Sequence, residues 1–564
     1  MRPEGPGRLN ETSTAVRQLY SCADSPPAVR FYPQAATKQS VSAVPERTDQ
    51  TRDGMASVTR GTFVMLLGTL GSIGFTFISR VILVRKLTVA SWGTFSLGLT
   101  IVGLLSAVAT LGLPSAVARN LAFLTEPADR RAIIRNSFRY MLPVTAVVSV
   151  GLFLFALVVG SVYHDPQLAL TLEYFSAIVA LGVPATLIAS IFQGFEDALP
   201  NAVFVQVLNP ALFIVFLVAT ESFLPLSKQF VGALAAYVVA DVVILALILL
   251  YLRYRVPRYV PAVSPTPGQG RRLIAFALPL LVVGVLTSVS GSTDTLVLGF
   301  LDRAEVGYYT ATLSLARLLG IGLSSVGYIF LPVAARYLGN RDSASLRLTY
   351  ATATKWTLIV ALPLFLVFLF FPGGSLGFVY GSHYSTTVAP LQVVVVGAFV
   401  ASLFGPASAA QIAFGRTQLV LVNTLIAAGA DVGLSFALIP SHGAVGAAVA
   451  WSVSSVLFPL LSTVELAWLE GLHPFERDYL LPLVVTLVPL ALAFALLPIH
   501  PTYLDLPPIA IGIAVLFVGV VLVTRSVDRG DRLLLEAVER FLGRPLPSVR
   551  RLGRWLLGST LSSV

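Results

Sequence analysis

Fourteen long apolar stretches run through this chain, and they constrain its fold more than any other feature. Each is close to the roughly 20 apolar residues that a helix needs to cross a bilayer. Only 12% of the residues are charged and 56% are hydrophobic, whereas soluble globular chains carry about 25% charged residues. The sequence therefore predicts an all-α polytopic membrane protein. The stretches lie near residues 61–84, 94–112, 141–162, 172–192, 203–220, 230–252, 273–293, 309–331, 356–371, 391–412, 418–439, 445–468, 479–497 and 508–524.

The distribution of basic residues predicts the topology. Most of the 38 Lys and Arg residues fall before the first span, after the last, or in the connections between spans two and three, six and seven, and eight and nine. The connections between spans three and four, nine and ten, eleven and twelve, and thirteen and fourteen hold none. The positive-inside rule then places both termini in the cytoplasm of a cell-membrane protein. Arg80, Arg85 and Lys86, at the predicted outer end of span one, do not fit this pattern.

Three short landmarks recur in the same order in the two halves of the chain. Since the copies are six spans apart, an even number, both insert with the same orientation. This predicts two six-helix lobes related by an axis along the membrane normal. Chance recurrence of Gly and Pro in apolar helices is the alternative. The pairs are Trp92-Gly93-Thr94-Phe95 with Val306-Gly307-Tyr308-Tyr309, Leu113-Pro114 with Leu331-Pro332, and Phe192-Gln193-Gly194 with Ala413-Phe414-Gly415.

The same reading divides the chain into segments. Residues 1–56 are rich in Ser, Thr and Pro and predict a disordered cytoplasmic tail, unless the true start is Met55. An N-lobe at 57–252, a Pro-rich cytoplasmic linker at 253–272 and a C-lobe at 273–468 follow, with two peripheral helices at 479–524. The basic tail at 525–564 has helical periodicity over 531–542, which predicts an amphipathic helix on the membrane or a solvated tail.

Two arginines within or near the spans are candidates for binding an anionic head group. Arg80 ends span one and Arg317 lies inside span eight, so they come from opposite predicted lobes. Two guanidinium groups in one cleft suit a phosphate or pyrophosphate, which they can bind bidentately. The alternatives are that Arg80 reaches the membrane interface and that Arg317 pairs with a membrane aspartate such as Asp294.

Three aspartates in the spans are candidates for ion coupling or for helix pairing. Asp241, Asp294 and Asp431 lie in or at the end of spans six, seven and eleven. Ionisable groups in a bilayer usually face a cavity or a partner, so these could bind a coupling H+ or Na+. Glu465 is near enough to the end of span twelve to reach the interface, and we expect no role for it.

Other chemistries find no support in the sequence. The single cysteine, Cys22, allows no internal disulfide, and the five histidines show no metal-ligand spacing, so no metal site is expected. There is no phosphate-binding loop or zinc-protease motif, and no loop is long enough for a catalytic domain, so we predict no cofactor and no catalytic residues. The net charge of +10 is explained by basic cytoplasmic loops rather than by nucleic acid.

At these residues the chain resembles the polysaccharide-transporter family, the lipid-linked oligosaccharide flippases of the multidrug/oligosaccharidyl-lipid/polysaccharide exporter superfamily. The resemblance implies a V-shaped two-lobe exporter fold and a cavity lined by cationic residues, which matches Arg80, Arg119 and Arg317. It spans about 57–524. The stretches that carry it are Arg80 to Gly93, Asp294-Thr-Leu-Val-Leu-Gly299 with Val306 to Ala311, and Leu438-Ile439-Pro440 with Gly443 to Ala448.

Together these features predict a monomeric flippase. It would carry a polyprenyl-(pyro)phosphate-linked oligosaccharide to the outer leaflet by alternating access, with membrane lipids and glycan-assembly enzymes as candidate partners. One alternative is an ion-coupled multidrug or cation antiporter of the same superfamily, which favours an acidic, aromatic cavity. Another is a membrane glycan polymerase or ligase, and a third is a non-transporting scaffold for glycan assembly.

Overall fold

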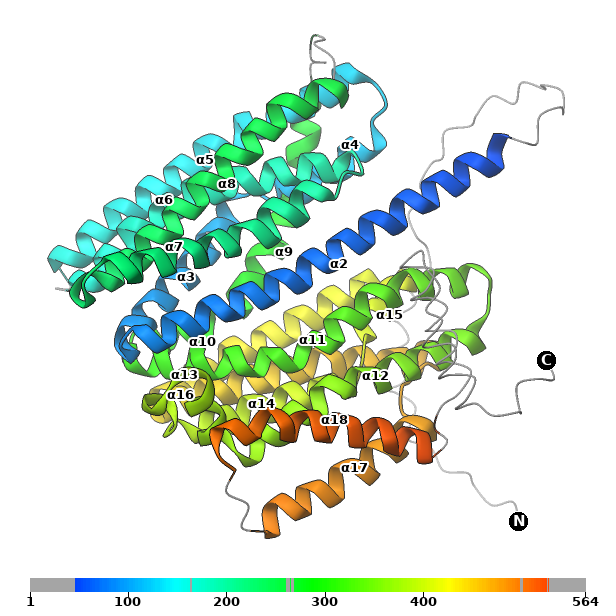
Figure 1. The fold of residues 1–564 in the computed structure, drawn as a ribbon. Helices are drawn as coiled ribbons and strands as arrows, with labels where there is room; N and C mark the ends of the chain where they lie inside the picture. The colour runs from blue at the N-terminus through cyan, green and yellow to red at the C-terminus, as the bar shows by residue number, and fades with distance from the viewer. Residues whose placement is uncertain are drawn as a thin grey trace, which may run out of the picture. The chain divides into compact units, whose positions relative to one another are not determined.

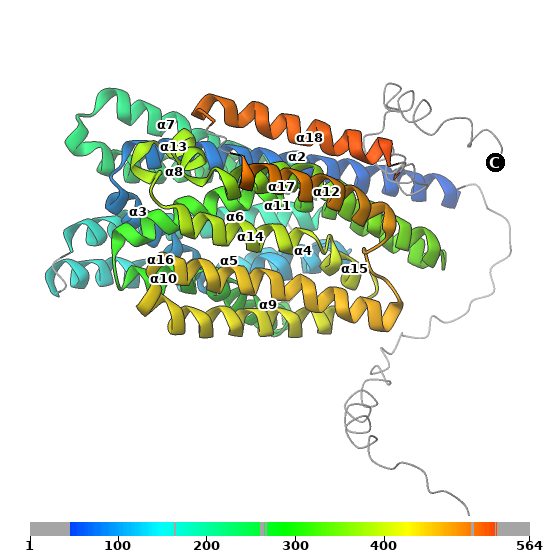
Figure 2. The ribbon, with the colours of Figure 1, turned by 90° about the horizontal axis from the view of Figure 1, so that it is seen from below.

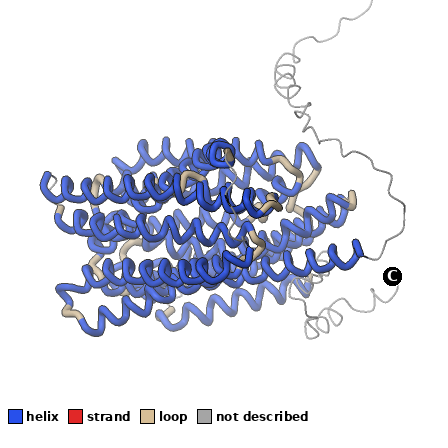
Figure 3. The backbone as a smooth tube through the Cα atoms, turned by 90° about the horizontal axis from the view of Figure 1, so that it is seen from above, coloured by secondary structure: helices blue, strands red, loops and turns tan. Residues whose placement is uncertain are grey.

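The computed structural model describes residues 46–162, 165–259, 264, 268–497, 501–524 and 526. Two units make up the chain, Met1–Met55 and Ala56–Val564, and all the predicted spans belong to the second. In the described part of the chain every regular element is a helix, and short loops join the helices (Figure 3). This follows from the apolar sequence, because a helix satisfies its own backbone hydrogen bonds where no water is present.

The described residues of the first half form seven α-helices and one π-helix. Side chains cap the N-termini of two of these helices. Thr88 accepts a hydrogen bond from Ser91 N at 3.2 Å, and Asp165 accepts one from Leu168 N at 2.9 Å. The elements are α2 (Glu46–Lys86), α3 (Val89–Ala109), α4 (Leu113–Phe123), α5 (Pro127–Val162), α6 (Pro166–Gly194), the π-helix η1 (Asn201–Leu208), α7 (Asn209–Phe223) and α8 (Gln229–Tyr259), with a 3₁₀ turn η2 (Leu226–Lys228) before α8.

The second half forms the remaining helices, several of which are broken in mid-course. Two of the breaks fall at glycines with positive φ, Gly405 between α14 and α15 and Gly443 within α16. The elements are α9 (Gln269–Ser290), α10 (Thr293–Gly299), α11 (Arg303–Gly339), α12 (Ser343–Phe370), α13 (Pro372–Tyr380), the 3₁₀ turn η3 (Ser382–Tyr384), α14 (Val388–Ser402), α15 (Ala407–Ala413), α16 (Thr417–Glu470), α17 (Arg477–Leu496), the 3₁₀ turn η4 (Tyr503–Asp505) and α18 (Leu506–Val523).

The predicted number of membrane passes is confirmed. Thirteen helices in the described residues are long and apolar enough to cross a membrane. One of them, α16, has 54 residues and contains Gly443 with φ 54° and ψ −132°, so it is two helices joined at a sharp bend. The carboxylate of Glu305 accepts a hydrogen bond from Ala444 N at 2.8 Å and so caps the second of them. The described residues therefore contain fourteen helical segments that are long and apolar enough to cross a membrane.

Helices of the first half pack on one another, as do those of the second half. In the unit that begins at Ala56, α5, α6, α7 and α8 lie side by side, and α11, α12, α14 and α16 form the other group (Figure 1). Helix α2 contacts both groups, because Thr69 donates to Gln206 of η1 at 3.2 Å and Arg80 donates to Ser314 of α11 at 3.1 Å. Two lobes with a shared helix between them result.

Helix α9, which was predicted to belong to the C-lobe that begins at residue 273, contacts both lobes. It packs against α3, α4 and α5 of the first half as well as against α16. Two glycines permit this approach. A Cβ on Gly112, whose φ is 66°, would lie 2.5 Å from the Ala277 carbonyl oxygen, and one on Gly270 would lie 2.6 Å from the Tyr140 hydroxyl. The first helix of the second half thus ties the two lobes together.

Segment boundaries also differ from those predicted. Helix α2 begins at Glu46, inside the predicted tail 1–56, because no proline interrupts the helix upstream of the apolar span. Helix α8 continues to Tyr259, so the linker predicted at 253–272 is shorter. Residues 1–45 and the basic tail predicted at 525–564, including its amphipathic segment 531–542, lie outside the described residues except for Ser526.

The last two helices lie at one side of the second lobe. α17 and α18 pack on each other and on α12 (Figure 2). Lys355 of α12 is 1% exposed and donates to the Ser526 carbonyl oxygen at 2.7 Å, just beyond the end of α18. A cation at a helix C-terminus is stabilised by the helix dipole, so this contact anchors α18 to the lobe.

Candidate functional site

The two lobes meet where α3 and α11 begin, at the end of the molecule predicted to face outside. A Cβ on Gly93 would lie 1.8 Å from the Arg303 carbonyl oxygen, and one on Gly307 would lie 2.2 Å from the Val89 carbonyl oxygen. Real Cβ atoms do not approach oxygen this closely, so only glycine allows this contact. Both glycines belong to the first repeated landmark of the sequence.

Equivalent residues of the two repeats touch each other at this junction. Thr310 donates to Ser96 Oγ at 3.2 Å across a separation of 214 residues, the separation that also relates Gly93 and Gly307. When a residue meets its own counterpart, the axis that relates the two copies passes between them. The α3–α11 contact therefore lies on the pseudo-twofold axis, which supports duplication over chance recurrence.

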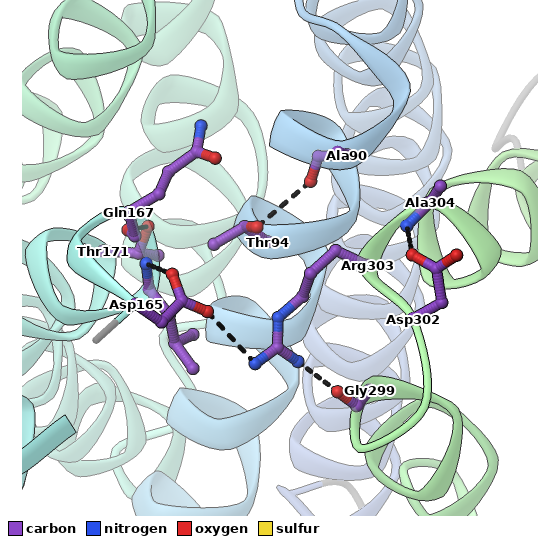
Figure 4. Close-up of polar contacts among 10 residues, drawn as sticks. Ala90, Thr94, Asp165, Gln167, Thr171, Gly299, Asp302, Arg303 and Ala304 are labelled. Atoms are coloured by element: carbon purple, nitrogen blue, oxygen red, sulfur yellow. Dashed lines mark hydrogen bonds and ion pairs between the residues drawn. The ribbon is translucent and has the colours of Figure 1, made fainter. Parts of the chain in front are cut away.

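An ion pair closes the same end of the junction. Arg303 at the start of α11 lies 3.3 Å from the Asp165 carboxylate at the start of α6, and it also donates to the Gly299 carbonyl (Figure 4). Both charged side chains are about 30% exposed, at 28% and 31%. Solvent screens such a pair, so its contribution to stability is about 1 kcal/mol or less.

A second contact explains the basic residues at the outer end of span one. Arg85 donates through Nε to the Val379 carbonyl at 2.7 Å and through Nη2 to the Phe378 carbonyl. These carbonyls are in the last turn of α13, where unpaired C=O groups and the helix dipole favour a cation. Arg85 therefore fastens the first span to the second lobe, which accounts for its departure from the charge pattern.

Arg80 and Arg317, the two predicted head-group residues, lie near each other between the lobes. Arg80 Nη1 donates to Ser314 Oγ, and Ser314 is one helical turn before Arg317 on α11. The two guanidinium charges lie within range of electrostatic repulsion, and the hydroxyls of Tyr237 and Tyr380 are within electrostatic range of Arg80. Arg80 is partly buried, whereas the Arg317 side chain is exposed.

The exposed side chain of Arg317 lies deep within a membrane-spanning helix. It lies fourteen residues after the start of α11, or about 21 Å at 1.5 Å per residue. At this depth a charged side chain is costly unless it faces water, a partner or a polar ligand. In the described residues Arg317 forms no ion pair within 4 Å, so it is not the direct partner of Asp294. The exposed Arg317 guanidinium is therefore free to meet water or a polar ligand.

Arg119 does not join this pair. Its side chain is exposed on α4, with the guanidinium 4.4 Å from the ring centroid of Phe276 and 5.2 Å from that of Phe123. No interaction links it to Arg80 or Arg317 in the part of the chain that the structure describes. The predicted set of three arginines is therefore split, because α4 begins after the break at Gly112 and carries Arg119 towards the opposite end.

Two of the three predicted aspartates lie together in the second lobe. Asp294 of α10 is 1% exposed and accepts hydrogen bonds from Tyr309 and from Thr295 N, the latter at 2.6 Å. Asp431 of α16 is also 1% exposed, and neither of its carboxylate oxygens has a hydrogen-bond partner in the described structure. The two carboxylates interact electrostatically, as do Asp294 and Arg317.

The third aspartate pairs two helices. Asp241 of α8 accepts a hydrogen bond from Asn209 of α7 at 2.6 Å. In the second lobe Asn423 donates to Glu465 at 2.8 Å, joining the two parts of α16, and Gln411 donates to the same carboxylate at 2.6 Å. The expectation that Glu465 reaches the interface was therefore wrong, because amide donors hold it between helices.

Sequence reasoning missed the polar groups around the arginines and aspartates. Ser314, Tyr237 and Tyr380 surround Arg80, and Tyr309 donates to Asp294. Only Tyr309 carried a signal, because it is part of a repeated landmark. Separately, an apolar groove of about 690 Å³ between α12, α14 and α16 contains none of these polar side chains.

Comparisons with known proteins agree with this architecture. Residues 58–338 match the family model described as "Polysaccharide biosynthesis protein", and residues 279–437 match the MatE model. A curated relative is the succinoglycan biosynthesis transport protein ExoT of Rhizobium meliloti (strain 1021), 22% identical over 305 residues. That match covers 54% of this chain and 59% of the relative, so the chain spans about three fifths of the relative's length.

Two solved structures share the fold. A lipid II flippase MurJ in an inward closed conformation gives a TM-score of 0.60 at 13% identity, over 80% of this chain and 97% of that one. An inward-facing multidrug resistance MATE family transporter gives 0.58 at 17% identity, over 74% and 99%. These identities are low, so the likeness establishes the fold alone.

The fold is that of multi-pass membrane transporters, and the relatives that these comparisons name are transporters rather than enzymes, which agrees with the sequence prediction. The two family matches and the ExoT relative support the predicted resemblance to the polysaccharide-transporter family of the multidrug/oligosaccharidyl-lipid/polysaccharide exporter superfamily.

Proposed function

We propose that this protein flips a polyprenyl-(pyro)phosphate-linked oligosaccharide from the cytoplasmic to the outer leaflet of the cell membrane by alternating access. The observation that carries the proposal is the pair Arg80 and Arg317, which brings two cationic groups from different halves of the chain together between the lobes. A lipid tail can stay in the bilayer while its anionic head group passes these guanidinium groups. The family match and the ExoT relative support this class of substrate.

Replacing either arginine by alanine tests the proposal. Each guanidinium that binds phosphate contributes about 1.5–3 kcal/mol, so Arg80→Ala and Arg317→Ala are each expected to lower translocation about 10- to 100-fold. The assay measures a polyprenyl-diphosphate-linked glycan crossing vesicles that contain purified protein. Arg119→Ala is the matched control, because Arg119 lies apart from the pair. Full activity of both variants at normal protein levels would reject the anion-binding role.

The main alternative is an ion-coupled multidrug or cation antiporter, since the second half matches the MatE model. Such a transporter would bind organic cations, and two repelling guanidinium groups at the lobe interface disfavour them. Binding of organic cations that is unaffected by Arg317→Ala would support this alternative. In our proposal the protein acts as a monomer with both termini in the cytoplasm, next to the enzymes that assemble its glycan.

We also propose that Asp294 and Asp431 bind a coupling H+ or Na+. Asp431 supports this, because a buried carboxylate without a hydrogen-bond donor is costly and gains most from a cation. We expect Asp431→Asn to abolish the response of translocation to an imposed Na+ or pH gradient in vesicles. Asp241→Asn is the control, since Asn209 already satisfies Asp241 and the gradient response should persist. A normal gradient response in Asp431→Asn would exclude this residue from coupling.

A further inference from the structure

Three exposed arginines gather where α5 and α9 pack, at the end predicted to be cytoplasmic. They are Arg135 and Arg139 of α5 and Arg271 of α9. The two helices approach closely at Gly270, whose added Cβ would lie 2.6 Å from the Tyr140 hydroxyl and 3.2 Å from Asn136 Cγ. This contact fixes how the two helices are turned towards each other.

Helix geometry puts all three arginines on the same side of this seam. Successive residues of an α-helix turn by about 100°, and α5 and α9 run in the same direction in the predicted topology. Asn136 and Tyr140 face α9, and Gly270 faces α5. On two parallel right-handed helices, the residues that precede Asn136 and Tyr140 and the residue that follows Gly270 turn to one common side. These residues are Arg135, Arg139 and Arg271.

Among the described residues, no group pairs with these charges. Arg135, Arg139 and Arg271 form no hydrogen bond or ion pair within the described ranges of the chain, and the first turn of α9 contains no acidic residue. Three like charges on adjacent helices repel one another. A ligand with one or more phosphate groups would relieve this repulsion and accept bidentate hydrogen bonds from the guanidinium groups.

Apolar side chains continue from the arginines towards the membrane centre. Leu278 and Val282 lie seven and eleven residues after Arg271, and Val150 lies eleven residues after Arg139, so each stays close to the same face of its helix. Their exposed fractions are 50%, 57% and 56%. A cationic end followed by an exposed apolar seam matches the head group and acyl chains of a lipid.

We propose that Arg135, Arg139 and Arg271 bind the head group of an anionic phospholipid whose acyl chains lie along the α5–α9 seam. The site is distinct from Arg80 and Arg317 and does not depend on the transported substrate. The bound lipid would hold the start of α9 against α5. Since α9 contacts both lobes, the composition of the adjacent leaflet would then affect how firmly the lobes are joined.

Lipid retention by the purified protein tests the proposal. Native mass spectrometry would count phosphatidylglycerol and cardiolipin carried by the full-length protein, with phosphatidylcholine as the neutral reference. Each Arg near the membrane surface strengthens the attraction of anionic lipid, so the triple variant R135Q/R139Q/R271Q should retain anionic lipid at least about tenfold less. The variant R135K/R139K/R271K should fall between the two, because it keeps charge and loses bidentate geometry.

A matched triple variant distinguishes specific lipid binding at these three arginines from a general effect of positive charge on that side of the protein. R336Q/R341Q/R477Q removes three exposed arginines at the same predicted membrane side and should retain anionic lipid as the parent does. Equal losses in both triple variants would overturn the proposal, as would equal retention of phosphatidylcholine and phosphatidylglycerol by the parent. Displacement of phospholipid by a polyprenyl diphosphate at the same arginines would also overturn it, in favour of a substrate-docking role. Unchanged melting temperatures would confirm that the variants are folded.

Discussion

Leucine at Gly307 is expected to lower translocation about 100-fold and to expose the outer end of the lobe junction. An added Cβ would lie 2.2 Å from the Val89 carbonyl oxygen, so α3 and α11 must move apart. Overpacking of this kind costs about 1–3 kcal/mol, and a closed state weakened by about 3 kcal/mol is populated about 100-fold less. Gly93→Leu should act in the same way, because Gly93 is the counterpart of Gly307.

Thiol labelling measures this opening. The native chain has one cysteine, Cys22, so Cys22→Ser gives a background without thiols. Thr94 on α3 is 2% exposed beside α11, and Thr94→Cys should resist a membrane-impermeant reagent until Gly307→Leu is added. Gly103→Leu and Gly320→Leu are matched controls on the same two helices, because an added Cβ at either meets no atom within 4 Å. Protection of Thr94→Cys together with normal translocation in Gly307→Leu would contradict the role of this contact.

The passes and the duplication could be predicted because both depend on local sequence. Apolar length determines a membrane pass, and the landmark glycines recur where the lobes touch. The sharp bend at Gly443 was also predictable as a break between spans eleven and twelve. The placement of α9 was not, because it depends on the close approach permitted by Gly112 and Gly270, and sequence periodicity does not show which helix a glycine will face.

The candidate site was predictable in part. Arg80 and Arg317 stood out because charge inside a span is costly, and the structure brings them together. Arg119 was grouped with them only through family resemblance, and the break before α4 carries it elsewhere. The pairing of Asn423 with Glu465 could not be predicted, because only the hydrogen bond in the structure shows it. Polar groups such as Ser314 carry no signal in sequence, because a serine inside a span usually bonds to its own helix.

Reversing the charge at Arg317 is expected to have the largest effect on substrate choice. Arg317→Glu removes one guanidinium, places a carboxylate near Arg80, and adds a third acidic group near Asp294 and Asp431. Lost charge-assisted hydrogen bonds and new repulsion of phosphate together amount to about 3–4 kcal/mol, so translocation of the anionic glycolipid should fall about 100- to 1000-fold.

The same variant separates the two classes of transporter. If the lobe interface selects anions, Arg317→Glu should lose binding of a polyprenyl diphosphate in a direct binding assay. Arg317→Lys should recover part of this binding, because it restores the positive charge but not the planar guanidinium group that binds phosphate bidentately. Ser324→Glu on α11 is the matched control, since it adds an acidic group at an exposed position two turns away. An antiporter for cations would instead bind organic cations more tightly in Arg317→Glu while polyprenyl diphosphate bound neither protein. That result would favour the cation antiporter over the glycolipid flippase, because the guanidinium groups would then not bind the transported substrate.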